Sequence, residues 1–304
     1  MTRSDLLRSL PAIDKVLKTE TVAALRREWL ASLVDDEVRA VVAEARQRIL
    51  DGEKMAGLDA ESLAAAAGSR LATRLAPGYP RCINATGVVL HTGLGRALLP
   101  PAALSALQRE LSGYNLVSID RDEGARVRRE TTIARILCAL TGAEAATMVN
   151  NNAAATLITL NTVAAGKEAI LSRGQLVEIG GSFRMPEVFR AAGVRLKEVG
   201  TTNRTHLRDY RDAIGEETGL LLRVHPSNFQ VVGFTKEVSL EELVALGREH
   251  DVPVVDDLGA GALVECPPEP RIGDSMRLGV DLLTCSGDKL IGGPQSGIIL
   301  GKRE

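Results

Sequence analysis

The stretch MVNNNAAATLITL, Met148 to Leu160, decides the class of fold, because it carries an apolar strand directly into an alanine-rich helix. Three asparagines, residues 150–152, stand at the junction. Helix N-termini expose backbone N–H groups and a partial positive charge, so they bind phosphate groups. One asparagine there is also a common helix cap, but three in a row exceed what a cap requires. The pattern favours an anion site at a strand–helix junction.

Short apolar runs alternate with helical patterns from about residue 82 onward. The runs cover residues 145–149, 168–172, 194–200, 219–225, 252–257, 281–286 and 297–300. Strands that are apolar throughout, with helical segments between several of them, are typical of parallel sheets covered on both faces. The sequence therefore predicts an α/β fold built on a mostly parallel sheet.

Residues 1–75 have a different texture, rich in alanine, leucine and charges of both signs. In residues 20–52 the apolar positions recur every three or four residues, which is typical of helices, and Gly52 closes the pattern. Lys and Arg balance Asp and Glu over the first 80 residues. We predict a helical amino-terminal domain over residues 1–75, without net charge, followed by a large domain over residues 76–304.

The composition is that of a globular protein: 304 residues, 45% hydrophobic, net charge −2 and pI near 6.2. Such a charge gives no overall basic field, so a nucleic-acid partner must be recognised locally. The four cysteines show no CxxC or metal-ligand spacing, and the apolar runs are too short to span a membrane. We predict a soluble, cytoplasmic protein. Because the chain stops at SGIILGKRE, within what reads as a strand, we also expect a fragment of a longer protein.

Two acids lie at the end of the apolar run VPVVDDLGAG, residues 252–261. Ligands bind at the carboxyl ends of strands in parallel sheets. An acid there could hold a metal, act as a base, pair with a protonated heterocyclic nitrogen, or cap a helix. Gly259 and Gly261 disfavour an immediate helix.

An asparagine, an acid and a lysine then follow the phosphate site in the order used by aminotransferase-type pyridoxal phosphate enzymes. Asn228 could hydrogen-bond the phenolic oxygen of the cofactor, and Asp256 could keep its ring nitrogen protonated. Lys289, in SGDKLIGG, could form the Schiff base, which requires a lowered pKa. Ser286 could donate to the phosphate. The order predicts pyridoxal 5'-phosphate as cofactor. The four histidines do not cluster as metal ligands, although His225 adjoins the predicted site.

The sequence resembles the bacterial selenocysteine synthase family, the L-seryl-tRNA(Sec) selenium transferases, from its first residues to its last. The segments that carry the resemblance are LPAIDKVL (10–17), NATGVVLHTGLGRALLP (84–100), LTGAEAATMVNNNAAAT (140–156), GQLVEIGGSFRMP (174–186), GTTNRTH (200–206), VHPSNFQVVGFT (224–235), DDLGAG (256–261) and SGDKLIGGPQSG (286–297). The block that joins GQLVEIGGSFRMP to GTTNRTH is far more specific than a general cofactor fold.

The resemblance implies a homo-oligomeric enzyme of pyridoxal phosphate fold type I, whose amino-terminal domain helps to grip the tRNA. Lys289 would carry the cofactor, with Asp288 assisting proton transfer, and Arg96 would bind the phosphate-like selenium donor. Asp256 would pair with the ring nitrogen, with the adjacent Asp257 left open as the alternative. The residues implied to hold the cofactor phosphate are Asn151, Asn152 and Ser286.

The implied reaction converts L-seryl-tRNA(Sec) to L-selenocysteinyl-tRNA(Sec) by β-elimination of water and addition of selenium from selenophosphate. This chain departs from the family at two positions: Gly93 replaces an asparagine that many relatives have, and Glu123 replaces an arginine. A carboxy-terminal small domain is also expected and missing. Two alternatives are a lyase or ammonia-lyase acting on a small amino acid or sugar acid, and a non-catalytic tRNA-binding scaffold. The LPAIDKVL segment argues against the first, and Lys289 against the second.

Overall fold

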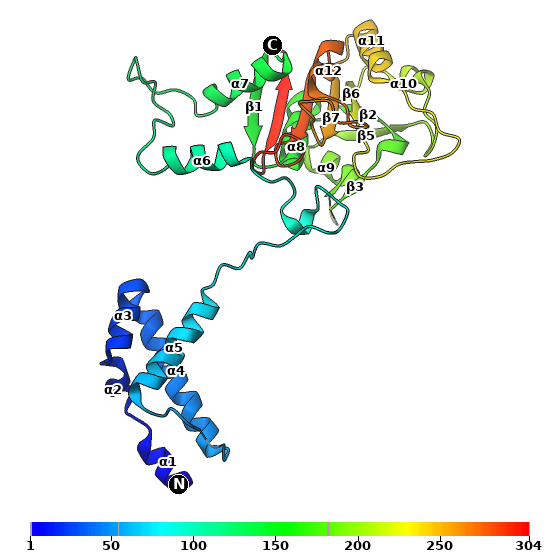
Figure 1. The fold of residues 1–304 in the computed structure, drawn as a ribbon. Coiled ribbons are helices and arrows are strands. Elements are labelled where there is room, and N and C mark those ends of the chain that lie inside the picture. The colour runs from blue at the N-terminus through cyan, green and yellow to red at the C-terminus, as the bar shows by residue number, and fades with distance from the viewer. Residues whose placement is uncertain (1, 54, 181–182, 304) are drawn as a thin grey trace. The chain divides into compact units, whose positions relative to one another are not determined.

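The computed structural model describes residues 2–53, 55–180 and 183–303. The chain divides into two compact units, Met1–Ile83 and Asn84–Glu304 (Figure 1). Among the described residues, none of the helices is both long and apolar enough to cross a membrane.

The first unit is entirely helical. Its helices are α1 (Arg3–Ser9), α2 (Ile13–Leu17), α3 (Glu20–Glu28), α4 (Ala31–Leu50) and α5 (Ala60–Arg74). The helical pattern of residues 20–52 is broken in the structure, because Trp29 is extended (φ −122°, ψ 159°) and ends α3. Valine, leucine and alanine side chains of α2 to α5 form a separate buried core, which includes Val38 and Leu71.

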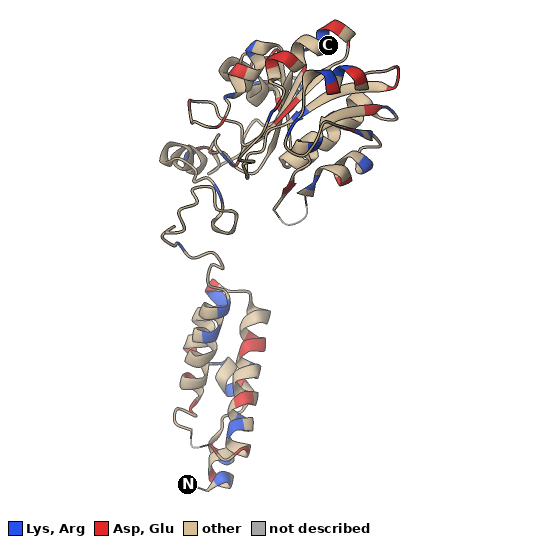
Figure 2. Ribbon diagram, turned by 90° about the vertical axis from the view of Figure 1, so that its right-hand side faces the viewer, with Lys and Arg blue, Asp and Glu red and all other residues tan. Residues whose placement is uncertain are grey.

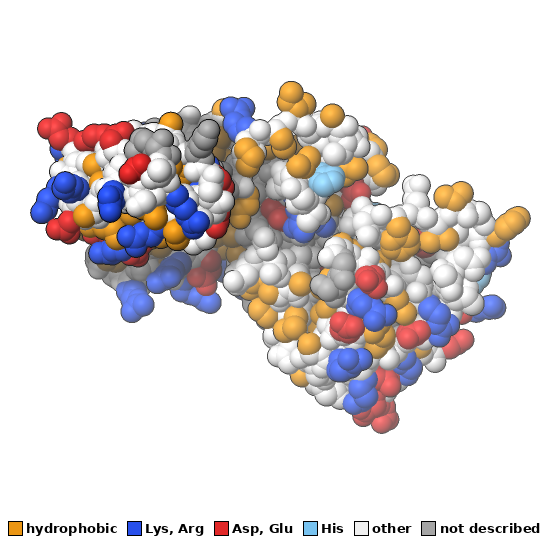
Figure 3. All heavy atoms as spheres, turned by 90° about the horizontal axis from the view of Figure 1, so that it is seen from below, with side chains coloured by type: hydrophobic (Ala, Val, Ile, Leu, Met, Phe, Trp, Pro, Cys, Tyr) orange, Lys and Arg blue, Asp and Glu red, His pale blue; other side chains and the backbone are white. Residues whose placement is uncertain are grey.

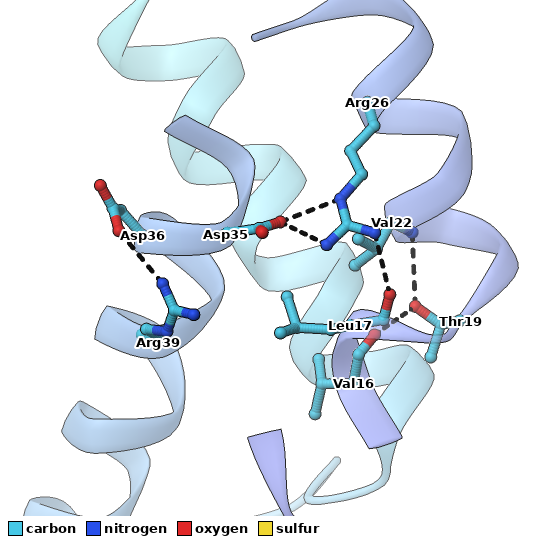
Figure 4. A network of polar contacts seen from close by, with 8 residues as sticks. All are labelled: Val16, Leu17, Thr19, Val22, Arg26, Asp35, Asp36 and Arg39. Atoms are coloured by element: carbon cyan, nitrogen blue, oxygen red, sulfur yellow. Dashed lines mark hydrogen bonds and ion pairs between the residues drawn. The ribbon is translucent and has the colours of Figure 1, made fainter. Parts of the chain in front are cut away.

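Polar contacts fix the start of α3 and its distance from α4 (Figure 4). The Arg26 guanidinium donates to Asp35 Oδ1 from Nε at 2.9 Å and from Nη2 at 2.5 Å, and its third nitrogen lies 3.4 Å from the Leu17 carbonyl. Thr19 caps α3 by accepting from the Val22 N–H. Positive and negative side chains alternate along these helices (Figure 2), as their balanced composition predicts.

The second unit is built on a seven-stranded sheet within the described residues, in the order β1-β9-β8-β7-β6-β2-β5. The strands are β1 (Ala145–Val149), β2 (Glu168–Ser172), β5 (Arg195–Val199), β6 (Thr218–Val224), β7 (Val254–Gly259), β8 (Leu282–Ser286) and β9 (Gly297–Gly301). All neighbouring pairs are parallel except the two that β9 makes. A separate hairpin joins β3 (Glu178–Ile179) to β4 (Phe183–Arg184). The predicted α/β fold with a mostly parallel sheet is confirmed.

Helices cover both faces of this sheet (Figure 1). They are α6 (Pro101–Glu110), α7 (Thr131–Thr141), α8 (Asn152–Ala164), α9 (Met185–Ala191), α10 (Leu207–Ala213), α11 (Leu240–His250) and α12 (Ile272–Leu278), with the short 3₁₀ turns η1 (Thr92–Leu94) and η2 (Arg173–Gln175). Successive strand residues contribute to different cores: Ile170 packs in the one that includes α7, α10, α11 and α12, and Leu171 in the one that includes α8 and α9. This two-sided burial explains why the strands are apolar throughout.

Much of the segment between residue 84 and α7 lies outside regular structure, and large apolar side chains are exposed there and on α6. Examples are Val89, Leu98, Leu111 and Tyr114. Figure 3 shows hydrophobic side chains exposed on the face of the molecule that it presents.

Candidate active site

A cavity of about 260 Å³ opens at the carboxyl ends of β6, β7 and β8, against the N-terminus of α8. Its polar lining residues are Arg96, Asn151, Asn152, His225, Ser227, Asp257, Ser286, Asp288, Lys289 and Gln295. Six residues expected from the sequence lie together here: Lys289, Asp288, Arg96, Asn151, Asn152 and Ser286. Segments far apart in the sequence meet in this pocket because the parallel strands all end at one edge of the sheet.

Lys289 lies in the turn that follows β8, and its side chain lines the pocket. Burial lowers the pKa of its amine, and the nearby positive charge of Arg96 lowers it further. Gly259 has a left-handed backbone (φ +64°), and a Cβ there would lie 3.1 Å from Ser227 Oγ and 4.0 Å from Lys289 Nζ. A glycine at this position therefore serves both the turn after β7 and the space around the amine.

Asp257 is a buried carboxylate that faces the pocket. It accepts hydrogen bonds from Asn152 Nδ2 (2.8 Å), the Gly259 N–H (3.2 Å) and Thr156 Oγ1 (3.2 Å). Burial raises the pKa of this carboxyl, and these hydrogen bonds oppose the increase. Because its hydrogen-bond donors are neutral, Asp257 is well suited to receive a cationic N–H from a ligand.

Asp256 points away from the pocket, which corrects the sequence prediction that it pairs with the ring nitrogen. Consecutive strand residues face opposite sides of a sheet. The Asp256 carboxylate instead accepts a 2.8 Å bond from Arg223 Nη1, within the sheet neighbour β6. The position toward the ligand belongs to Asp257, the alternative left open from the sequence.

Asn228 is also displaced from its predicted place. It is exposed, and its side-chain amide lies 3.5 Å from the Glu178 carbonyl instead of lining the pocket. The same segment presents His225 and Ser227 to the cavity. The chain turns directly after β6, where Ser227 N–H donates to the His225 carbonyl, so residues beyond 227 leave the pocket.

The asparagines at the start of α8 divide two tasks. Asn151 is the helix cap, extended at φ −164°, and its Oδ1 accepts from the Ala154 N–H at 2.9 Å. Asn152 donates to Asp257, while its own Oδ1 is buried without a hydrogen-bond partner among the described residues. The N-terminus of α8 therefore brings backbone N–H groups and the supporting amide of Asp257 to the same pocket.

Arg96 and Asp288 form an ion pair at the mouth of the turn, with Arg96 Nη1 2.7 Å from Asp288 Oδ2. The Ala97 N–H also donates to the Asp288 carbonyl at 3.3 Å. Gly93 lies nearby in sequence, and a Cβ there would lie 3.2 Å from the His91 ring. Glu123 is exposed outside the pocket.

Known proteins give this constellation a family. The family model described as L-seryl-tRNA selenium transferase matches residues 82–304 of the chain. The chain belongs to the L-seryl-tRNA selenium transferase family. The expected family is therefore confirmed over the unit that contains the pocket.

Curated relatives extend this match to the first unit. The L-seryl-tRNA(Sec) selenium transferase of Carboxydothermus hydrogenoformans is 46% identical over 100% of this chain and 66% of its own length. That of Geotalea uraniireducens is 50% identical over 98% of this chain and 66% of its own length. The chain thus spans 66% of the length of these selenium transferases.

Solved structures share the fold of the second unit at low sequence identity. A D-glucosaminate-6-phosphate ammonia-lyase matches with a TM-score of 0.56 at 22% identity, over 70% of this chain and 56% of that one. A serine palmitoyltransferase from S. paucimobilis, with bound PLP–myriocin aldimine, matches with a TM-score of 0.51 at 14% identity, over 71% and 52%. These likenesses support the fold-type I architecture expected of a selenium transferase.

In this member of the selenium transferase family, two features of the pocket were missed from the sequence. Ser227 gives no signal in the sequence beyond its place at a strand end. Glu269 lies 3.2 Å from His225 Nε2, yet it comes from the loop before α12, which no sequence pattern links to β6. Only the folded chain brings these two segments together.

Proposed function

We propose that this chain belongs to an enzyme that uses pyridoxal 5'-phosphate to convert L-seryl-tRNA(Sec) to L-selenocysteinyl-tRNA(Sec), with selenophosphate as the donor, in the cytoplasm. The observation that carries the proposal is the pairing, in one pocket, of a lysine of lowered pKa with a buried acid at a helix N-terminus. Membership of the selenium transferase family supports the choice of reaction.

The residues of the pocket fit pyridoxal phosphate. The N–H groups at the start of α8, with Asn151, Asn152 and Ser286, suit its phosphate. Asp257 suits its protonated ring nitrogen, because the unmatched need of this buried carboxylate is a cationic donor. When bound, the cofactor supplies an electron sink for the Cα of the substrate.

The protein side chains would then divide the remaining work. Lys289 holds the cofactor through its amine and, once released, takes the proton from the substrate Cα. Arg96 offers a guanidinium that suits the oxyanion of selenophosphate. Asp288, now paired with Arg96 at 2.7 Å, assists proton transfer when the donor anion takes its place. A lowered pKa of Lys289 supports its role, because only the neutral amine is a nucleophile or a base.

We assign tRNA binding to the helical unit and self-association to the exposed apolar side chains. The helices of the first unit mix both signs of charge (Figure 2), which supports local recognition of the tRNA rather than attraction by a net field. The exposed leucines and tyrosine in and after α6 support a homo-oligomer, since monomers rarely leave such surfaces uncovered.

The lyase alternative is not favoured. The ammonia-lyase likeness, at 22% identity, concerns the fold alone, whereas the transferases are 46–50% identical over nearly the whole chain.

The test is binding of the protein to seryl-tRNA(Sec) and to seryl-tRNA(Ser), at one fixed salt concentration because phosphate contacts depend strongly on salt. We expect clear preference for the selenocysteine tRNA. Equal or negligible binding of the two would contradict the proposed substrate and leave the cofactor site standing.

A further inference from the structure

His225 and Glu269 form a contact at the pocket that no role described so far explains. His225 Nε2 lies 3.2 Å from Glu269 Oε2, with 17% and 20% of the two side chains exposed. The other surface histidine–carboxylate contact, His250 with Glu249, is longer at 3.8 Å and lies at a helix end. The His225 pair is thus the one that combines short distance, burial and a place on the pocket wall.

Both partners are held by the backbone. The His225 N–H donates to the Asp257 carbonyl at 2.9 Å, so the histidine stands directly beside the acid of the pocket. The Glu269 N–H donates to the Cys266 carbonyl at 2.9 Å, within the loop that precedes α12. Two anchored segments therefore fix the ring and the carboxylate against each other.

The carboxylate has a clear task toward the ring. Glu269 Oε2 is buried without a hydrogen-bond partner among the described residues, so the imidazole Nε2 is its near polar neighbour. A carboxylate behind one ring nitrogen fixes the proton on that nitrogen and leaves the other nitrogen for chemistry. Such an arrangement lets a histidine first accept a proton and later return it.

The other ionisable groups of the pocket already have tasks. Lys289 takes the Cα proton, Asp257 faces the ring nitrogen, and Asp288 is paired with Arg96. The substrate needs two further proton movements. Its α-ammonium group must lose a proton before it can react as an amine, and its β-hydroxyl must gain one to leave as water. Histidine is the side chain whose charge ordinarily changes near neutral pH.

We propose that His225 carries this proton and that Glu269 is the residue that positions it. The inference rests on the proposed function. The imidazole takes a proton from the α-ammonium group of the seryl substrate. When the Cα–H bond breaks, that proton goes to Lys289 and its electron pair forms the Cα–Cβ double bond. The Cβ–O bond breaks, and His225 gives its proton to the departing hydroxide, which leaves as water. His225 ends as it began.

The positioning role is tested by nitrogen-15 NMR of the imidazoles, which is practicable because the chain has four histidines. Loss of one set of signals in His225→Gln assigns the ring. We expect a ring with its proton fixed on Nε2 in the wild-type protein and in Glu265→Ala, an exposed glutamate of the same loop. Glu269→Ala should give mixed tautomers. Unchanged His225 signals in Glu269→Ala would overturn the positioning role, whether or not the enzyme turns over.

The proton-carrying role is tested on the cofactor-loaded protein with seryl-tRNA(Sec), by following two steps separately. We expect His225→Gln to slow release of the β-hydroxyl oxygen as water by about 100-fold, and Glu269→Ala by about 10-fold. Exchange of the Cα hydrogen with solvent, which depends on Lys289, should persist in both, and Glu269→Gln should recover part of the loss. KM should change little.

The failures are distinguishable. If the wild-type protein exchanges Cα hydrogen and releases the oxygen, but neither variant slows release, the inference about His225 is wrong and the proposed function stands. If the wild-type protein does neither step with seryl-tRNA(Sec), the proposed function is wrong, and with it the proton-carrying role.

Discussion

At the scale of residues, two neighbouring acids carry different functions that the sequence does not distinguish. Asp256 and Asp257 are both buried, because the sheet is covered on both faces. In a strand with one exposed face, the alternation of polar and apolar residues would have shown which acid faces the ligand. In β7 only the fold shows that Arg223 takes Asp256 and the pocket takes Asp257.

Substitution of each acid by asparagine separates these functions. Asp256→Asn leaves the buried Arg223 without its partner and should lower the free energy of unfolding by about 3 kcal/mol. Asp257→Asn should leave stability of the cofactor-free protein unchanged or higher, because burial already disfavours the charged carboxyl. It should weaken cofactor binding by about 2 kcal/mol, the value of a charge-assisted hydrogen bond. Denaturant unfolding and cofactor titration measure the two effects. The reverse assignment of effects would contradict the facing of the two acids.

Lys289 should make stability depend on pH in a defined direction. Its pKa in the folded protein lies below the ordinary value of 10.5, so folding disfavours the charged amine. This cost is fully present below the folded pKa and disappears as the pH rises through the ordinary value. Lys289→Met should therefore raise the melting temperature of the cofactor-free protein at neutral pH, and the gain should vanish toward alkaline pH. Lys236→Met, at an exposed lysine, is the control. A gain that does not change with pH would show that charge burial is not its cause.

At the scale of elements, the strands were predictable and their neighbours were not. Apolar runs such as residues 145–149 and 168–172 coincide with β1 and β2, because full burial demands apolar side chains along the whole strand. The antiparallel direction of β9 left no trace, since a buried strand reads the same either way. The end of α3 was missed because Trp29 fits the helical spacing and leaves the helix through its backbone angles.

The turn after β7 gives a prediction at this scale. Gly259→Ala and Gly166→Ala both place a side chain on left-handed backbone (φ +64° and +76°), at a cost of about 1 kcal/mol each. A Cβ at residue 166 meets nothing within 4 Å, whereas one at residue 259 meets Ser227 Oγ and approaches Lys289 Nζ. Both variants should lose similar stability, but only Gly259→Ala should bind cofactor more weakly. Equal cofactor affinity in the two variants, measured by titration, would remove Gly259 from the site.

At the scale of the whole molecule, each of the two units has its own hydrophobic core. The composition shift near residue 76 foretold a change of domain, and the contacts divide the chain at Ile83. The residues that line the pocket all belong to the second unit. Ligand binding stabilises the part of a protein that holds the ligand.

The cofactor should therefore stabilise one unit selectively. The single tryptophan, Trp29, reports unfolding of the first unit through its fluorescence. At cofactor concentrations near 100 times the dissociation constant, we expect the second unit to gain about 2.7 kcal/mol. Its transition, followed by circular dichroism of the sheet, should move to higher temperature while the Trp29 transition stays in place. If the Trp29 transition moves by the same amount, the two units unfold together.

The measurement that tests the central claim most directly is chemical trapping of the cofactor. Borohydride reduction of the protein with bound pyridoxal phosphate, followed by peptide mapping, identifies the lysine that holds it. The pocket at the ends of β6, β7 and β8 predicts one labelled peptide, carrying the label on Lys289, and none in Lys289→Ala. A label on another lysine, or an unlabelled wild-type protein, would contradict the assignment of this pocket as the cofactor site.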